Sequence, residues 1–295
     1  MAATFKHMKW LITGANGQLG RCLQDTLRVK GIEYIALSKS DLDVSDASRT
    51  KALFSELNPG VVLNAAAYTN VERAESEQIE AFEINAIGAS NVAQASKTIG
   101  AKLVHFSTDY VFSGRRNLPW EVSDLTEPTS IYGKSKLAGE IEVSTIYPDG
   151  SLIIRTAWLY SKYGKNFYKT ILNLALKDQN PINVVADQFG QPTCAIDLAG
   201  LAVSAISKNL PTGIYHGTSS GKSNWHEFAV EIFKLAGADS NRVRAISSKD
   251  YETRASRPIF SVLDNSKWND YGVESIGPWQ DSVISAFPDI YESLS

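Results

Sequence analysis

The chain has 295 residues, of which 43% are hydrophobic and 21% charged, and its formal net charge at pH 7 is −3. This composition is typical of a folded protein with a sizeable core, arranged as one large domain or two smaller ones. A small negative charge excludes the basic surface that nucleic acids and anionic membranes require, so the expected partners are small molecules.

Nothing in the sequence indicates export or membrane insertion. No apolar run approaches the roughly 20 residues needed to cross a bilayer, and MAATFKHMKW lacks the apolar core of a secretion signal. Cys22 and Cys194 have neither metal-ligand spacing nor a disulfide framework, which fits packing residues in a reducing compartment. We therefore expect a cytoplasmic protein, and residues 1–7, native or added, are left out of the fold prediction.

In chain order, the first half alternates short apolar runs with amphipathic segments, which is the pattern of βαβ units. Strands are expected at 9–13, 33–37, 61–65, 102–107 and 151–155. Helices, with apolar residues at helical spacing, are expected at 18–30, 46–57, 81–99 and 130–146. The predicted fold class is therefore α/β, with a Rossmann-like, doubly wound parallel sheet.

Beyond residue 155 the pattern loosens into helices, such as 223–237, mixed with short strands and loops rich in proline and glycine. We predict two domains: a dinucleotide-binding Rossmann domain at 1–155 and a smaller α/β domain, mainly substrate-binding, at 156–295. Some segments of the second part are expected to return to the main sheet.

The segment TGANGQLG follows the first predicted strand and places Gly14, Gly17 and Gly20 at three-residue intervals before a helix. Glycines let backbone N–H groups approach a pyrophosphate, and the N-terminus of the next helix adds partial positive charge. The spacing is GxxGxxG and not GxGxxG, so a glycine-rich turn without a ligand is the alternative. The predicted cofactor contacts here are Gly14, Asn16, Gly17, Gln18 and Leu19.

The second predicted strand ends in LSKS, without the carboxylate that NAD-binding folds often place about 20 residues after the first glycine. Lys39 is available for a 2′-phosphate, so NADPH is the preferred cofactor. NADH is the alternative, because Asp41 lies close by.

Two further segments are predicted to contact the cofactor. In DLDV, Asp43 is placed to accept a hydrogen bond from the adenine amino group, and Val44 to offer its backbone N–H. In NAAAY, Ala65, Ala66 and Ala67 let the cofactor lie against the strand ends, with tight packing as the alternative.

The segment IYGKSKLAGE sets Tyr132 four positions before Lys136 in a predicted helix, so both side chains share one face. The lysine cation would favour the phenolate and lower the phenol pKa, which suits acid–base catalysis at a carbonyl or alcohol. Taken alone the motif is weak, because a chain with 12 tyrosines contains such pairs by chance.

The order of these parts, GxxGxxG, NAAA, STDYVFSG and YxxxK, resembles the extended short-chain dehydrogenase/reductase family. That family has a Rossmann-like sheet and uses a Ser or Thr, a Tyr and a Lys around the nicotinamide. The resemblance implies that Thr108, Tyr132 and Lys136 are catalytic, and that Tyr132 and Lys136 also contact the cofactor.

Within that family, six segments in order resemble the dTDP-4-dehydrorhamnose reductases: NAAAYTNVERAESE, STDYVFSG, YGKSKLAGE, RTAWLYSKYGKNF, DQFGQPT and RPIFSVLDNSK. The resemblance implies NADPH-dependent reduction of the C4 ketone of dTDP-4-dehydro-L-rhamnose to dTDP-L-rhamnose, a nucleotide-sugar precursor of cell-surface polysaccharide such as lipopolysaccharide O-antigen. It makes Tyr110 and Trp158 candidates for the sugar pocket, Asn166 and Phe167 for the nucleotide end, and Arg257 for the diphosphate. A structural role is the alternative for each.

Some family members are thought to dimerise around a magnesium ion held by glutamates. Here Ile196 followed by Asp197 stands where a carboxylate is expected after the PT of DQFGQPT. No metal is therefore predicted, and the oligomeric state is left open, a homodimer included.

Other functions stay open at this point. One is a non-catalytic NADP-binding regulatory subunit, like the beta subunit of methionine adenosyltransferase, which shares the glycine turn, DYVF and YGKxKL. Another is a ketoreductase for a different nucleotide sugar or the opposite C4 stereochemistry. Thr108 and the RPIFSVLDNSK segment favour the reductase, and Asp109 alone does not establish epimerase or dehydratase chemistry.

Overall fold

The computed structural model describes residues 8–177 and 179–294, so residues 1–7 lie outside the described residues. A six-stranded sheet, with every neighbouring pair parallel, forms its centre in the order β10-β5-β4-β3-β1-β2. The strands are β1 (Trp10–Thr13), β2 (Tyr34–Leu37), β3 (Val61–Asn64), β4 (Lys102–Thr108), β5 (Ser151–Thr156) and β10 (Gly213–His216). The five strands predicted in the first half agree within one residue at each end, and the α/β fold class is confirmed.

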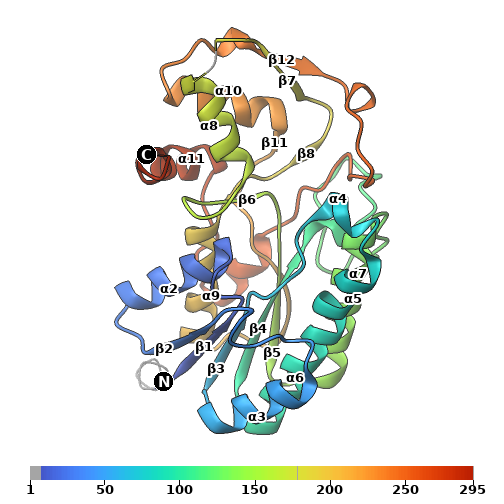
Figure 1. Ribbon diagram of the computed structural model, residues 1–295, viewed down its shortest axis with the longest axis vertical. Coiled ribbons are helices and arrows are strands. Elements are labelled where there is room, and N and C mark those ends of the chain that lie inside the picture. The colour runs from blue at the N-terminus through green and yellow to red at the C-terminus, as the bar shows by residue number, and fades with distance from the viewer. Residues whose placement is uncertain (1–7, 178, 295) are drawn as a thin grey trace.

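Helices cover both faces of this sheet (Figure 1). Trp10 and Ile12 of β1 belong to one core cluster with α2 (Gln18–Val29) and α9 (Ala195–Ser207). Leu11 points to the opposite face, because successive strand residues alternate, and it joins a second cluster. The helices there are α3 (Ala47–Leu57), α6 (Gly88–Ile99) and α7 (Ile131–Ile146). The sheet is thus doubly wound, as predicted.

The helix expected at 81–99 is longer and less regular than predicted. It comprises α5 (Gln78–Phe82), a π-helical turn η1 (Glu83–Ile87) and α6, preceded by the short α4 (Val71–Ala74). Asn85 in the π turn is buried, accepts from the Tyr68 N–H (2.8 Å) and donates to the Tyr68 carbonyl and to Ser135 Oγ. Single π turns of this kind are rare within α-helices and are frequent at functional sites. Asn85 therefore ties the loop after β3 to α7.

Segments beyond residue 155 also contribute to the six-stranded sheet and its covering helices. β10 pairs in parallel with β5, with His216 opposite Arg155 at the carboxyl end, and α9 packs on α2. Almost every residue of α9 is apolar or small, and most of the helix is buried.

The rest of the second part has a core of its own, in which Tyr160, Tyr168, Phe228, Ile232 and Val283 are buried. Its elements are β6 (Leu159–Tyr160), α8 (Phe167–Lys177), β7 (Ile182–Val185), β8 (Phe189–Gly190), β9 (Thr193–Cys194), β11 (Ser223–Asn224), α10 (Trp225–Leu235), β12 (Val243–Ile246) and α11 (Trp279–Glu292). Short 3-10 turns lie at η2 (Asp109–Val111), η3 (Ser240–Arg242), η4 (Ser248–Asp250) and η5 (Ser266–Tyr271). From the separate core we infer the second domain, with α9 and β10 as its returning segments.

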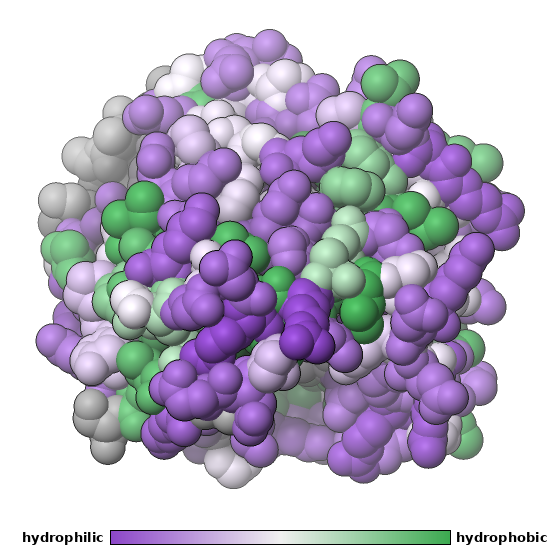
Figure 2. Space-filling model, turned by 90° about the horizontal axis from the view of Figure 1, so that it is seen from above, coloured by the Kyte–Doolittle hydropathy of each residue, from purple (hydrophilic) through white to green (hydrophobic). Residues whose placement is uncertain are grey.

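The end of the molecule uppermost in Figure 1 is seen face-on in Figure 2. Hydrophilic residues cover most of this face and hydrophobic ones are scattered among them, which is the pattern of a surface in contact with water. Among residues 8–177 and 179–294, no helix has the length and apolar character that a membrane span requires. Cys22 and Cys194 are both buried and unpaired, and burial raises the pKa of each thiol to about 12.

Candidate active site

A cavity of about 610 Å³ opens at the carboxyl ends of the central strands, a size typical of small-molecule sites. β1 lies between β2 and β3 in the sheet, so the chain runs to one side after β1 and returns to the other side for β3. Open α/β sheets bind ligands at such a switch point, outside the strand ends. The cavity wall continues into the second part of the chain at Thr156, Ala157, Trp158, Leu159 and Trp225.

The glycine turn forms one end of this cavity. Gly14 has a φ of +66°, and a Cβ there would lie 2.6 Å from the Ala65 carbonyl carbon, so only glycine fits. Gly17 is the N-cap of α2, and no side chain caps the first turn of that helix. No side chain therefore competes for the backbone N–H groups at the start of α2, which form the kind of donor set that a pyrophosphate needs.

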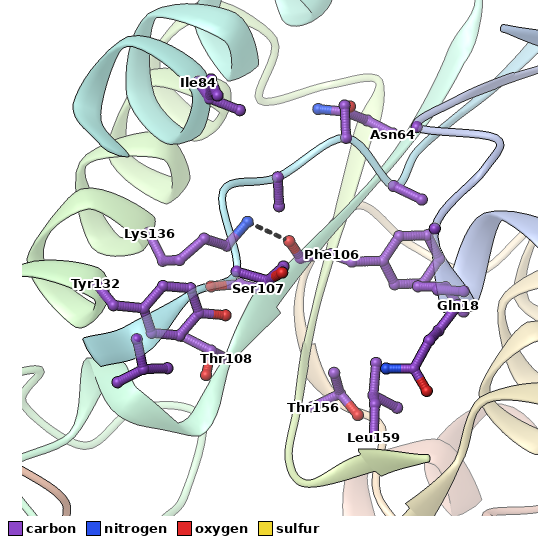
Figure 3. Close-up of a pocket in the computed structure, with 18 of the residues that line it drawn as sticks. Gln18, Asn64, Ile84, Phe106, Ser107, Thr108, Tyr132, Lys136, Thr156 and Leu159 are labelled. Atoms are coloured by element: carbon purple, nitrogen blue, oxygen red, sulfur yellow. Dashed lines mark hydrogen bonds between the residues drawn. The ribbon is translucent and has the colours of Figure 1, made fainter. Parts of the chain in front are cut away.

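The three residues expected to be catalytic lie together on the cavity wall (Figure 3). Thr108 ends β4, while Tyr132 and Lys136 project from the first turns of α7 toward that strand. The Lys136 ammonium donates to the Phe106 carbonyl at 2.7 Å. Thr108 and Tyr132 both line this wall, and the neighbouring Thr108 hydroxyl acts to lower the pKa of the phenol.

The net pKa shift of Tyr132 is nevertheless the opposite of the one expected. Burial outweighs the Thr108 contact and raises the pKa of the phenol to about 12. Lys136 does not lower it, because the ammonium is directed to the backbone of β4, and burial lowers the pKa of Lys136 itself to about 8. At neutral pH the phenol keeps its proton, so Tyr132 is set to donate one rather than to accept one.

Asp109 is a buried carboxyl beside this group that the sequence analysis did not place in the reductase site. It accepts from Thr108 Oγ1 at 3.0 Å and lines the cavity. Burial raises the pKa of Asp109 to about 6, and the hydrogen bond from Thr108 opposes this shift only in part. In the sequence, the only indication that Asp109 lies at the site was its position next to Thr108 in STDY.

Every residue predicted to contact the cofactor lines the cavity. Lys39, proposed for the 2′-phosphate, lies 3.7 Å from Glu80. Asp41, the basis of the NADH alternative, is not among the described residues that line the cavity. Its carboxylate accepts hydrogen bonds from the backbone N–H and the hydroxyl of Ser38. Asp43 Oδ1 accepts hydrogen bonds from the backbone N–H and the hydroxyl of Ser45.

Of the predicted substrate residues, Tyr110 and Trp158 line the cavity. Trp158 has a φ of +47°, an unfavourable conformation for a large side chain, and its ring stacks on Trp225 with centroids 3.6 Å apart. Gly190 lies beneath the same ring, since a Cβ there would come within 2.5 Å of it. The surrounding packing therefore holds Trp158 in place, and Trp225 joins the site without having been predicted.

Asn166, Phe167 and Arg257 are not among the described residues that line the cavity. Asn166 donates to Gln18 and to the Ser161 carbonyl, and it caps α8. Phe167 packs on the rings of Trp225 and Phe228, and Arg257 pairs with Glu72 at 2.8 Å. Lys165, the residue before Asn166, was not predicted and lies on the cavity wall. The place where α8 begins decides which of the residues 165–167 faces the cavity.

Comparison with known proteins agrees with this geometry. A family model described as RmlD substrate binding domain matches residues 8–291. A dTDP-4-dehydrorhamnose reductase of Streptomyces griseus is 41% identical over 284 residues, covering 95% of this chain and 93% of that protein. A dTDP-4-keto-6-deoxy-D-glucose reductase of Streptomyces niveus is 38% identical over 280 residues, covering 95% and 96%.

The same relationship holds among solved structures. The crystal structure of dTDP-4-dehydrorhamnose reductase from Bacillus anthracis in complex with NADP superposes with a TM-score of 0.92. The two sequences are 39% identical, and the match covers 96% of this chain and 99% of the other. The chain therefore belongs to the RmlD substrate binding domain family, the family of the dTDP-4-dehydrorhamnose reductases.

Proposed function

We propose that the protein reduces the C4 ketone of dTDP-4-dehydro-L-rhamnose to give dTDP-L-rhamnose, with NADPH as the preferred cofactor. The observation that carries the proposal is the grouping of Thr108, Tyr132 and Lys136 on the wall of a cavity whose other end is the glycine turn. NADPH, when bound, supplies the hydride for the ketone carbon. NADH stays the alternative cofactor.

The chain's own residues are proposed to bind the cofactor along one edge of the sheet. The uncapped N-terminus of α2 and the turn at Gly14 and Gly17 hold the pyrophosphate. Lys39 takes the 2′-phosphate, while Asp43 and Val44 take the adenine. The alanines after β3 let the cofactor lie close to the strand ends.

Proton transfer is assigned to Tyr132. Its phenol keeps its proton at neutral pH, because the pKa is raised to about 12, and donates it to the ketone oxygen as alkoxide forms, while Thr108 hydrogen-bonds the same oxygen. Lys136, buried beside Phe106, is proposed to hold the nicotinamide ribose hydroxyls. Catalysis of this kind contributes about 10²–10⁴-fold, and orientation of the reactants supplies more.

The substrate is proposed to lie between Tyr110 and Trp158. Arg257 stays the candidate for the diphosphate, and its guanidinium pairs with Glu72. Asn166 and Phe167 are proposed to support the nucleotide end indirectly, through Gln18 and Trp225.

Absorbance at 340 nm, recorded with dTDP-4-dehydro-L-rhamnose and each reduced nicotinamide in turn, tests substrate and cofactor together. No oxidation of either nicotinamide would overturn the proposal. The second candidate, a ketoreductase for a related dTDP sugar, is favoured by the Streptomyces niveus relative, and NMR of the product separates the two.

Two finer proposals concern the protein in the cell. The unpaired, buried thiols of Cys22 and Cys194 support a reducing cytoplasm as its location. The partner is proposed to be a nucleotide sugar, and light scattering on the purified protein tests the homodimer.

A further inference from the structure

The lysine proposed for the 2′-phosphate already has an anionic neighbour. Lys39 Nζ lies 3.7 Å from Glu80 Oε1, and the two side chains are 71% and 49% exposed. A second cavity adjoins the first at Lys39, Asp43 and Ile84. Its wall includes three carboxylates of the segment around α5: Glu77, Glu80 and Glu83. The adenosine end of the site is therefore more acidic than LSKS alone indicates.

Three other carboxylates of this region have hydrogen-bond partners of their own. Asp41 and Asp43 accept hydrogen bonds within their own turns. Glu77 pairs with Arg73 and accepts from Tyr68. Within the described part of the chain, Glu80 is the carboxylate whose ion pair is with Lys39.

We propose that Glu80 is a positioning residue that sets cofactor preference, by pairing with Lys39 in competition with the 2′-phosphate. The proposal rests on the proposed cofactor site and deepens it. A 2′-phosphate carries nearly two negative charges and must displace the carboxylate from Lys39 and then lie beside it. The 2′-hydroxyl of an NAD cofactor is uncharged, so it does not compete with Glu80 for Lys39. Glu80 thus weakens NADP binding and brings the two affinities closer together.

The test is cofactor binding to Glu80→Gln, measured as the Kd of NADP⁺ and of NAD⁺ by calorimetry without substrate. We expect the Kd ratio of NAD⁺ to NADP⁺ to rise about three- to tenfold at low ionic strength, because one nearby charge is removed. The gain should shrink at high salt, since both side chains are exposed. General damage to the fold would weaken both cofactors alike and leave this ratio unchanged.

Two controls separate the effect of the Lys39–Glu80 ion pair from the effect of any negative charge on this cavity wall. Glu83→Gln removes the same charge from the same cavity wall, and a smaller change in the ratio is expected because Glu83 is not paired with Lys39. In a Lys39→Gln background, Glu80→Gln should raise the ratio less, because only the direct repulsion between the carboxylate and the phosphate is then removed. An unchanged ratio in Glu80→Gln, an equal effect of Glu83→Gln, or a full effect without Lys39 would each overturn the proposal. If the wild-type protein oxidises neither nicotinamide with the ketosugar at 340 nm, that result counts against the proposed reaction and not against the role of Glu80.

Discussion

At the scale of single residues, the proposed reaction depends on Tyr132, its proposed proton donor. Tyr132→Phe keeps the ring but removes the proton, so we expect turnover to fall about 10²–10⁴-fold. Cofactor Kd should stay within about tenfold, the effect of one lost hydrogen bond. Wild-type turnover in this variant would show that another group supplies the proton.

Lys136→Ala is the matched comparison for that measurement. Lys136 is buried and bonded to Phe106, and it is proposed to hold the cofactor as well. We therefore expect both turnover and cofactor affinity to be lost, in contrast to Tyr132→Phe.

Asp109 should make stability depend on pH. Burial raises the pKa of this carboxyl from 3.8 to about 6, so the folded state favours the protonated form. Its stabilising contribution is complete below pH 3.8 and is lost as pH rises through about 6. Asp109→Asn has no such loss, so its stability relative to wild type should increase from pH 4 to pH 7 by up to about 3 kcal/mol. Urea unfolding at several pH values measures this, and a difference independent of pH would contradict it.

At the scale of elements, β8 fixes the tryptophan pair in the substrate cavity. A Cβ at Gly190 would lie 2.5 Å from the Trp158 ring, so Gly190→Ala must displace the ring from Trp225. We expect the KM for the nucleotide sugar to rise about tenfold, the loss of about 1.4 kcal/mol of aromatic contact, with little change in cofactor Kd. Gly200→Ala in α9 is the control, because a Cβ at Gly200 would meet no neighbouring element within 4 Å.

The helix starting at Gln78 shows what local pattern leaves out. Apolar spacing predicted a single regular helix from 81, whereas the structure has a π turn that turns Asn85 toward Tyr68 and Ser135. Helical periodicity describes one face of a helix, and it carries no information about a polar partner on another element. By contrast, the strands were predicted within one residue, because buried parallel strands are short apolar runs bounded by turn residues.

At the scale of the whole molecule, the cavity is lined by both parts of the chain, from Gly14 to Trp225. Cofactor binding should therefore stabilise both cores together. At 100 times its Kd, NADP⁺ is expected to raise the free energy of unfolding by about 2.7 kcal/mol. Differential scanning calorimetry should show one transition that moves as a whole. Two transitions, of which NADP⁺ moves only one, would contradict this coupling.

The sequence by itself determined the α/β alternation, the glycine turn and the YxxxK pair, because each depends on residues close together in the chain. The residues proposed for the cofactor lie close to the ends of parallel strands, which meet at one edge of the sheet, and the structure shows that they line one cavity. Only the tertiary structure decided the rest. The pKa of Tyr132 depends on burial, Lys39 meets Glu80 across two elements, and Lys165 faces inward while Asn166 does not. Solvation and charge at a site are sums over neighbours that are distant in sequence, so no local pattern contains them.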